Sequence, residues 1–137
     1  MRHHLHIALH VADRERSTAF YARVFGQEPD KEACGYARFT LEDPALVLTL
    51  NARKEVRTGD RLSHLGIRMG DRATFETFRD RLRAAGLIAR EEHAVTCCHA
   101  VQDKVWTEDP DGNSWEFYEL LEDLDPTAAT ARSGGCC

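Results

Sequence analysis

The stretch "HIALHVADRERSTAFYARVFG" at residues 6–26 decides the fold, because a similar stretch follows it at a shift of 58 positions. Residues 64–84 read "HLGIRMGDRATFETFRDRLRA", and five aligned pairs are identical, among them His6 with His64. In each stretch, apolar residues first alternate as in a strand and then recur at helical spacing. The sequence therefore predicts two modules with the same local structure.

Each predicted module continues with further strands, so that both have the order β-α-β-β-β. The first is predicted to contain strand 4–11, helix 15–25, a weak strand at 27–33, and strands 36–42 and 45–51. The second is predicted to contain strand 63–69, helix 73–85 and strands 87–93, 101–107 and 114–120, with "DPDGN" (109–113) as its last turn. Two such modules side by side predict an α+β fold, in which a cupped mixed sheet surrounds a cavity.

The module boundaries follow from the composition of the intervening segments. Residues 1–53 are expected to form the first module, the polar stretch 54–61 a linker, and residues 62–122 the second module. The Ala-, Thr-, Ser- and Gly-rich end, 123–137, is expected to be a mobile tail. A chain of 137 residues suits one domain overall.

Composition narrows the possible functions. The chain is 42% hydrophobic and 30% charged, with a net charge of −5, which is typical of a soluble globular protein. Lys and Arg are scattered among acidic residues, so nucleic acid is not expected as a partner. Because no apolar run approaches the about 20 residues of a membrane span, we expect a cytoplasmic protein without a membrane partner. In that compartment its five cysteines are expected to be reduced thiols.

Two histidines and one carboxylate form a candidate metal site. His6 and His64 occupy equivalent strand positions, so both are expected to face the cavity. Glu116 stands between two aromatic residues in a strand expected to be central, where a buried carboxylate needs a cationic partner or a metal. This ligand set is typical of non-haem Fe(II) and also suits Zn, Mn or Ni.

Other interpretations of these residues remain open at this point. A histidine in a strand is more often a packed or surface residue than a ligand. His4 and His10 share the strand face of His6, and only the repeat favours His6. Glu116 alone could instead pair with Arg68.

The segment "TCCHAVQDK" at residues 96–104 contains adjacent cysteines, Cys97 and Cys98, in an expected loop at 94–100. Neighbouring Cα atoms lie about 3.8 Å apart, whereas unstrained disulfides prefer about 4.4–6.8 Å. Structural zinc sites use more widely spaced cysteines. The pair therefore favours a dithiol site for a soft, thiophilic centre such as trivalent arsenic, cadmium or mercury. The alternative is two small buried residues that are adjacent by coincidence.

Further residues near this pair or at the chain end are weaker candidates. Cys136 and Cys137 form a second adjacent pair, which could capture metalloid or be part of a solvated tail without a role. Gln102, Asp103 and Lys104 begin the next strand, where they could shape or gate the loop or serve as ordinary hairpin residues. His99 adjoins the first pair.

The whole chain resembles the vicinal-oxygen-chelate superfamily of glyoxalases, bleomycin-resistance proteins and extradiol dioxygenases. The β-α-β-β-β repeat and the ending "DPDGNSWEFYE" carry this resemblance. Within it, "TCCHAVQDKVWTEDPDGNSWEFYE", together with "HIALHV" and "SHLGIRM", is similar to the organoarsenical carbon–arsenic lyases over residues 4–121. The Cys-Cys segment is far more specific than the strand motifs.

This resemblance implies an Fe(II)- and O₂-dependent enzyme that cleaves the carbon–arsenic bond of trivalent methyl or aromatic arsenicals to give arsenite. It implies metal ligation by His6, His64 and Glu116, and arsenic binding by the catalytic thiols Cys97 and Cys98. Other divalent metals such as Ni, Co, Mn or Zn could substitute for iron. The family often has an aromatic residue at the position of His99. This difference bears on the shape of the substrate pocket and not on the reaction. The chain could be a monomer or a homodimer.

Two alternatives accompany this interpretation. The related cadmium-induced proteins share the Cys-Cys segment but lack the histidine of the first strand, so His6 favours the lyase. A cadmium- or arsenic-binding resistance protein without turnover is one alternative. Another glyoxalase-like metalloenzyme, in which the cysteines are incidental, is the second.

Overall fold

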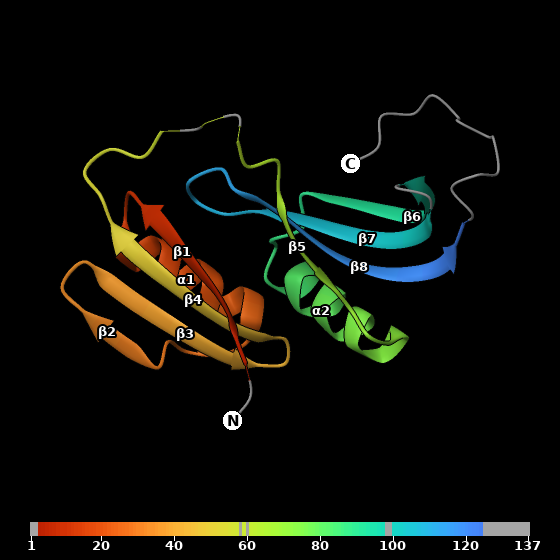
Figure 1. The fold of residues 1–137 in the computed structure, drawn as a ribbon, viewed down its shortest axis with the longest axis horizontal. Helices are drawn as coiled ribbons and strands as arrows, with labels where there is room; N and C mark the ends of the chain where they lie inside the picture. Colours follow the sequence, from red (N-terminus) through yellow and green to blue (C-terminus); the bar gives the residue numbers. More distant parts are fainter. Residues whose placement is uncertain (1–2, 58, 60, 98–99, 125–137) are drawn as a thin grey trace.

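The computed structural model describes residues 3–57, 59, 61–97 and 100–124, and it contains two consecutive modules (Figure 1). The first module consists of β1 (Leu5–Val11), α1 (Arg14–Phe25), β2 (Lys31–Ala33), β3 (Tyr36–Glu42) and β4 (Ala45–Ala52). The second consists of β5 (Leu65–Arg68), α2 (Arg72–Ala84), β6 (Arg90–Cys97), β7 (Ala100–Glu108) and β8 (Ser114–Asp123).

Both modules have the same sheet topology. The first sheet has the order β1-β4-β3-β2 and the second β5-β8-β7-β6, so that the first and last strands of each module are neighbours. These neighbours run parallel, while the remaining pairs are antiparallel. The α+β fold with two βαβββ modules, which the repeat predicts, is therefore confirmed.

The identical aspartates of the repeat begin the two helices. The Asp13 carboxylate accepts a hydrogen bond from the backbone N–H of Arg16 at 3.0 Å, and Asp71 accepts one from that of Thr74 at 2.7 Å. An N-terminal carboxylate of this kind satisfies a helix donor that otherwise lacks a partner. At the other end of α1, Gly26 takes the left-handed conformation with φ 64°, which glycine adopts without steric cost.

One apolar core joins the modules. Tyr21 and Phe25 of α1 pack against Trp115 of β8, with ring centroids 6.0 and 6.2 Å apart. Each of these three side chains is at most 8% exposed. Burial of such aromatic area contributes strongly to stability, so the two modules stabilise each other.

The "DPDGN" turn adds polar contacts between the modules. The Tyr21 hydroxyl donates to Asp109 Oδ2 at 2.6 Å and accepts from the Trp115 indole N–H at 3.1 Å. Asp111 accepts hydrogen bonds from the backbone N–H of Ala12 at 3.0 Å and from the hydroxyl of Ser17 at 3.4 Å. The turn between β7 and β8 is therefore fixed to the start of the first helix.

The buried tyrosine makes stability sensitive to alkaline pH. Burial, and then the negative charge of Asp109, raise the pKa of Tyr21 well above its ordinary value. A pKa that is higher in the folded than in the unfolded state gives stability that is complete below the unfolded value of about 10 and is lost as the pH rises above it. We expect the free energy of unfolding, measured by urea titration, to fall above about pH 10. Tyr21→Phe should remove part of this dependence, whereas Tyr36→Phe should retain it.

The structure corrects two strand assignments. Strand β6 occupies Arg90–Cys97 rather than 87–93, so that residues 94–97 are strand and not loop. Leu87 and Ile88 instead pack on the core directly after α2, where the backbone N–H of Leu87 donates to the carbonyl of Leu82 at 2.9 Å. The expected weak strand at 27–33 is reduced to the three residues of β2.

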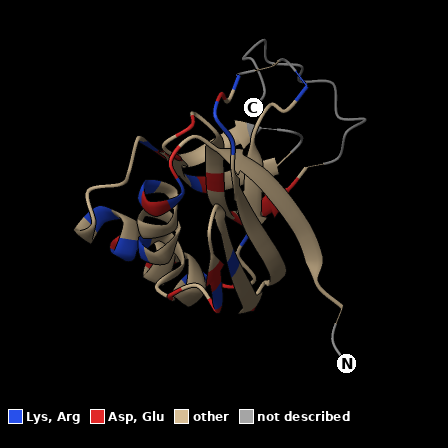
Figure 2. Ribbon diagram, turned by 90° about the vertical axis from the view of Figure 1, so that its left-hand side faces the viewer, with Lys and Arg blue, Asp and Glu red and all other residues tan. Residues whose placement is uncertain are grey.

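Charged residues of both signs are interspersed along the chain (Figure 2). Several are paired, as Arg72 is with Glu76 one turn further along α2. Within the described ranges, no helix combines the length and apolar character that crossing a membrane requires.

Candidate functional site

Glu116 is the buried acid of the candidate site. Trp115 and Phe117 on either side of it are 2% and 0% exposed and belong to the core, so Glu116 lies on the opposite face of β8. That strand is central, between β5 and β7, and Glu116 itself is only 7% exposed. Glu116 is therefore buried in a central strand, on the face opposite the apolar core.

The two oxygens of Glu116 face different neighbours. The ammonium of Lys104, whose side chain is 1% exposed, lies 3.1 Å from Oε2. The Nε2 atom of His64 lies 3.6 Å from Oε1. The cation paired with Glu116 is thus Lys104, whereas sequence analysis considered Arg68 for this role. A buried carboxylate needs such compensation, since desolvation of an isolated charge is costly.

The surroundings of His64 orient its ring. The Ser63 hydroxyl lies 2.9 Å from Nδ1, and the Trp106 ring packs edge-on with its centroid 5.2 Å away. With one ring nitrogen engaged by Ser63, the other is directed toward Glu116. Outer contacts of this kind commonly fix the orientation of a metal-binding histidine.

Gly66 makes room for Glu116. It lies directly opposite Glu116 in the parallel ladder between β5 and β8. A Cβ atom at this position would stand only 2.8 Å from Cγ and 3.3 Å from Oε1 of the glutamate. The small residue next to His64 is therefore required for the close approach of the two strands at this carboxylate.

The histidines of β1 have separate contacts. His6 Nε2 lies 3.3 Å from the hydroxyl of Thr49 in the middle of the first sheet. His4 approaches Glu42 at 3.2 Å and His10 approaches Arg53 at 3.4 Å, near opposite ends of the strand. His4 and His10 thus each contact a charged side chain, whereas the contact of His6 described here is with a neutral hydroxyl.

The structure brings two of the three predicted metal ligands together. His64 and Glu116 adjoin, whereas His6 belongs to the other module, and the described part of the chain contains no cluster of three or more His, Cys, Asp or Glu side chains suited to a metal. The donor set nevertheless fits a divalent metal, because one imidazole nitrogen and one carboxylate oxygen already converge.

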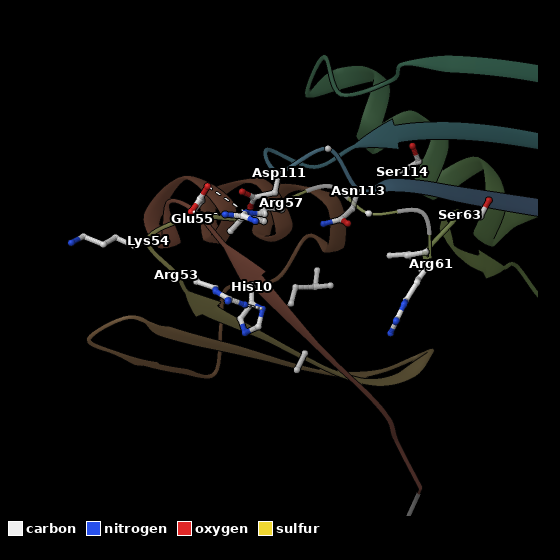
Figure 3. Close-up of a pocket in the computed structure, with 16 residues that line it drawn as sticks. His10, Arg53, Lys54, Glu55, Arg57, Arg61, Ser63, Asp111, Asn113 and Ser114 are labelled. Atoms are coloured by element: carbon white, nitrogen blue, oxygen red, sulfur yellow. Dashed lines mark hydrogen bonds and ion pairs between the residues drawn. The ribbon is translucent and has the colours of Figure 1, made fainter.

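A cavity of about 1010 Å³ opens between the modules beside these residues (Figure 3). Ala8 and His10 of β1 line it on one side, and Ser63 and Ser114 line it on the other. By strand alternation, Ala8 belongs to the face of His6 and Ser114 to the face of Glu116. His6, His64 and Glu116 themselves are not among the residues that line it.

Arg53 and the basic residues of the linker form another wall of this cavity, which sequence analysis did not foresee. Arg53, Lys54, Arg57 and Arg61 line it together with the acidic Glu55 and Asp111. Arg57 lies 3.4 Å from Glu55, and Arg53 and His10 point toward each other (Figure 3). The only sequence signal was a polar composition, which predicted a linker.

The cysteine segment is described in part. Cys97 is the last residue of β6 and pairs with Ala100 of β7. Cys98, His99, Cys136 and Cys137 lie outside the described residues. Gln102 and Lys104 are both buried on β7, at 5% and 2% exposure.

Asp103 lies between Gln102 and Lys104, and the sequence left the same two roles open for all three residues, shaping the loop or forming an ordinary hairpin edge. Asp103 is 7% exposed and receives the guanidinium of Arg72 at 2.6 Å and the backbone N–H of Ala94 at 2.7 Å. Burial raises the pKa of Asp103, but these two hydrogen bonds outweigh burial and lower it overall.

The fold and the site define the class of protein. The family model described as "Glyoxalase/Bleomycin resistance protein/Dioxygenase superfamily" matches residues 3–117, and the chain belongs to this superfamily. Among solved structures, a glyoxalase/bleomycin resistance protein/dioxygenase from Alicyclobacillus acidocaldarius has the same fold, with a TM-score of 0.69 at 17% identity over 88% of this chain and 92% of its own. A lactoylglutathione lyase from Agrobacterium tumefaciens reaches 0.63 at 23% identity, over 84% and 91%.

Curated relatives are closer in sequence. The chain is 43% identical to the trivalent organoarsenical cleaving enzyme of Bacillus sp. (strain MD1), over 82% of this chain and 70% of the relative. It is 41% identical to the enzyme of the same name from Thermomonospora curvata, over 96% and 85%. The cadmium-induced protein CadI of Mycobacterium tuberculosis (strain ATCC 25618 / H37Rv) is 44% identical, over 85% and 76%.

Proposed function

We propose that this protein cleaves the carbon–arsenic bond of trivalent organoarsenicals, such as methylarsenite or trivalent aromatic arsenicals, and releases arsenite in a reaction that depends on Fe(II) and O₂. The observation that carries this proposal is the contact on the second sheet between the buried Glu116 and the partly exposed His64, with Oε1 of the glutamate 3.6 Å from Nε2 of the histidine. The similarity to two trivalent organoarsenical cleaving enzymes over most of the chain supports the same reaction. The cellular role would be arsenical resistance in the cytoplasm.

His6, His64 and Glu116 would hold the iron, which when bound supplies the activation of O₂. Lys104 binds Oε2 of Glu116, so that Oε1, on the side of His64, is the oxygen available to the metal. Ser63 holds Nδ1 of His64 and leaves Nε2 for ligation. Trp106 packs edge-on against His64 and so helps to hold the orientation of its ring.

The substrate would be held by Cys97 and Cys98. Each thiol replaces one hydroxyl group on the trivalent arsenic and releases one water molecule, so that two sulfur–arsenic bonds form and the carbon substituent remains. Neighbouring residues, with Cα atoms about 3.8 Å apart, suit such chelation. Arsenic bound in this way would be held at a defined position relative to the proposed metal site, and the reaction would not depend on a chance encounter.

Arsenite release tests the proposal directly. Protein loaded with Fe(II) under anaerobic conditions is mixed with methylarsenite and then exposed to air, and arsenite is separated and quantified over time. We expect release only after air is admitted, and loss of release in Cys98→Ser. The matched control is Cys34→Ser, because Cys34 is exposed between β2 and β3. Absence of release in air would refute the proposal.

A second candidate function is metalloid or cadmium binding without turnover, which the similarity to the cadmium-induced protein CadI favours. This alternative predicts stoichiometric binding that requires Cys97 and Cys98 and neither O₂ nor His6. The same assay on His6→Ala distinguishes the two functions, since only cleavage should depend on this histidine.

Whether the active form is a monomer or a homodimer is tested by light scattering of the loaded protein.

A further inference from the structure

The strand that leads to the cysteine pair contains a β-bulge. Its first half pairs regularly with β7 up to Glu92, which lies opposite Lys104. The second half resumes with Val95 opposite Gln102, so that three steps on β6 match two steps on β7. One extra residue is thus inserted after Glu92, and Ala94 has a φ of 47°, in the left-handed region that non-glycine residues rarely adopt.

The extra residue determines the face on which position 97 lies. Residues that oppose each other in an antiparallel ladder lie on the same face, and one step along a strand changes the face. Cys97 lies opposite Ala100, which shares a face with Gln102, Lys104 and Trp106, and Trp106 lies opposite Glu116. The bulge therefore places position 97 on the face of the sheet that carries Glu116.

Without the bulge, regular pairing from Glu92 onward would bring Thr96 opposite Ala100. Position 97 would then fall on the other face, toward α2. The first half of β6 cannot shift by one residue to compensate, because its own contacts fix its register. The backbone N–H of Ala89 donates to the carbonyl of Trp106 at 2.8 Å, and Arg83 of α2 pairs with Glu91 at 2.7 Å.

Asp103 fixes the bulge from the opposite strand. Its Oδ1 accepts the backbone N–H of Ala94 at 2.7 Å, which is a donor that the disrupted ladder leaves without a strand partner. Its Oδ2 accepts from Arg72 of α2 at 2.6 Å, and Arg72 in turn contacts Glu119 of β8 at 2.8 Å. The strained residue of the bulge is thus tied through Asp103 to the helix and to the central strand.

We propose that Asp103, supported by Arg72, is a positioning residue that holds the β-bulge at Ala94 and thereby places Cys97 on the face of the sheet that carries Glu116. The importance of this placement for catalysis rests on the proposed function, in which Cys97 binds the arsenic. The placement itself is a property of the fold and is measurable without turnover.

Pairing of β6 with β7 is measured first, by cross-strand NMR contacts in isotope-labelled full-length protein. The wild type should show contacts between residue 97 and residue 100, and Asp103→Ala should replace them with contacts between residues 96 and 100. Ala94→Gly is the matched control, since glycine favours the positive φ and should retain the wild-type pairing. Unchanged pairing in a folded Asp103→Ala protein would overturn the proposal.

Arsenite release is measured second, on the same variants. We expect Asp103→Ala to lower the rate by about 10–100-fold, the size of effect that displacement of a reacting group produces. Deletion of Ala94 in the Asp103→Ala chain should restore the rate, because a strand without the extra residue reaches the pairing of 97 with 100 without any bulge. A simple loss of stability would not be rescued by a deletion, and failure of this rescue would overturn the proposal.

These two measurements separate the inference from the proposed function. If wild-type protein releases no arsenite while its pairing shifts in Asp103→Ala, the proposed function fails and the placement of position 97 by Asp103 stands. If wild-type protein releases arsenite and the pairing in Asp103→Ala is unchanged, the function stands and the role of Asp103 fails.

Discussion

Replacement of Glu116 by Gln is expected to reduce arsenite release by more than about 100-fold, since even the loss of groups that only support a metal ligand costs about 10–100-fold. The amide retains the size of the side chain, so the strand contact with Gly66 is preserved. It removes the charge that faces both Lys104 at 3.1 Å and His64 at 3.6 Å. A neutral amide oxygen is a weaker ligand for a divalent metal than a carboxylate is.

Three measurements on Glu116→Gln separate the metal site from the thiol site. Bound iron after dialysis should fall with activity, while the stoichiometry of methylarsenite binding to the thiols should remain that of the wild type. Glu122→Gln on the same strand is the matched control, because Glu122 is exposed and should leave all three values unchanged. Full arsenite release by Glu116→Gln would exclude this carboxylate as a ligand.

Replacement of Asp109 by Ala is expected to destabilise the protein by about 3–5 kcal/mol, because several donors lose a charged acceptor and each unsatisfied buried donor costs about 1–3 kcal/mol. Asp109 is 4% exposed. It accepts hydrogen bonds from the Tyr21 hydroxyl, from the backbone N–H groups of Asp111 and Asn113, and from the Asn113 side chain. Alanine would leave these donors without their acceptor, and buried donors without partners are costly.

Urea unfolding followed by tryptophan fluorescence measures this loss, since Trp115 donates to the same Tyr21 hydroxyl. Glu108→Ala serves as the control, because the neighbouring Glu108 is exposed and should change stability by less than about 0.5 kcal/mol. A free energy of unfolding for Asp109→Ala equal to that of the wild type would show that the Asp109 contacts do not stabilise the protein.

The repeat made most of the fold predictable from the sequence. It aligned Asp13 with Asp71, and both residues begin helices in the structure. It also selected His6 and His64 as equivalent positions, and alternation alone placed Glu116 on the inner face of its strand. These features depend on local periodicity, which a single sequence contains.

The parts that the sequence did not predict depend on strand register and on packing between elements. The hairpin of β7 and β8 was predicted, but its sequence does not show that the Lys104 ammonium lies against Glu116. The bulge at Ala94 follows a polar run in which no apolar period reveals the inserted residue. Leu87 and Ile88 look like the start of a strand, but they pack against the core because the chain leaves α2 at that point.

In the contact between Tyr21 and Asp109, the first half of the chain contributes the hydrogen-bond donor and the second half contributes the acceptor. At the shift of 58 positions that relates the halves, the counterpart of Tyr21 is Arg79. The second half therefore has no hydroxyl at this position to donate to the turn. A chain built from two copies of the second half would therefore have the acceptor without its donor. A chain built from two first halves would have the donor without the "DPDGN" acceptor. The duplication is symmetric in strand order, yet its halves are not interchangeable parts, and a chimera with a related protein must take both sides of this contact from the same parent.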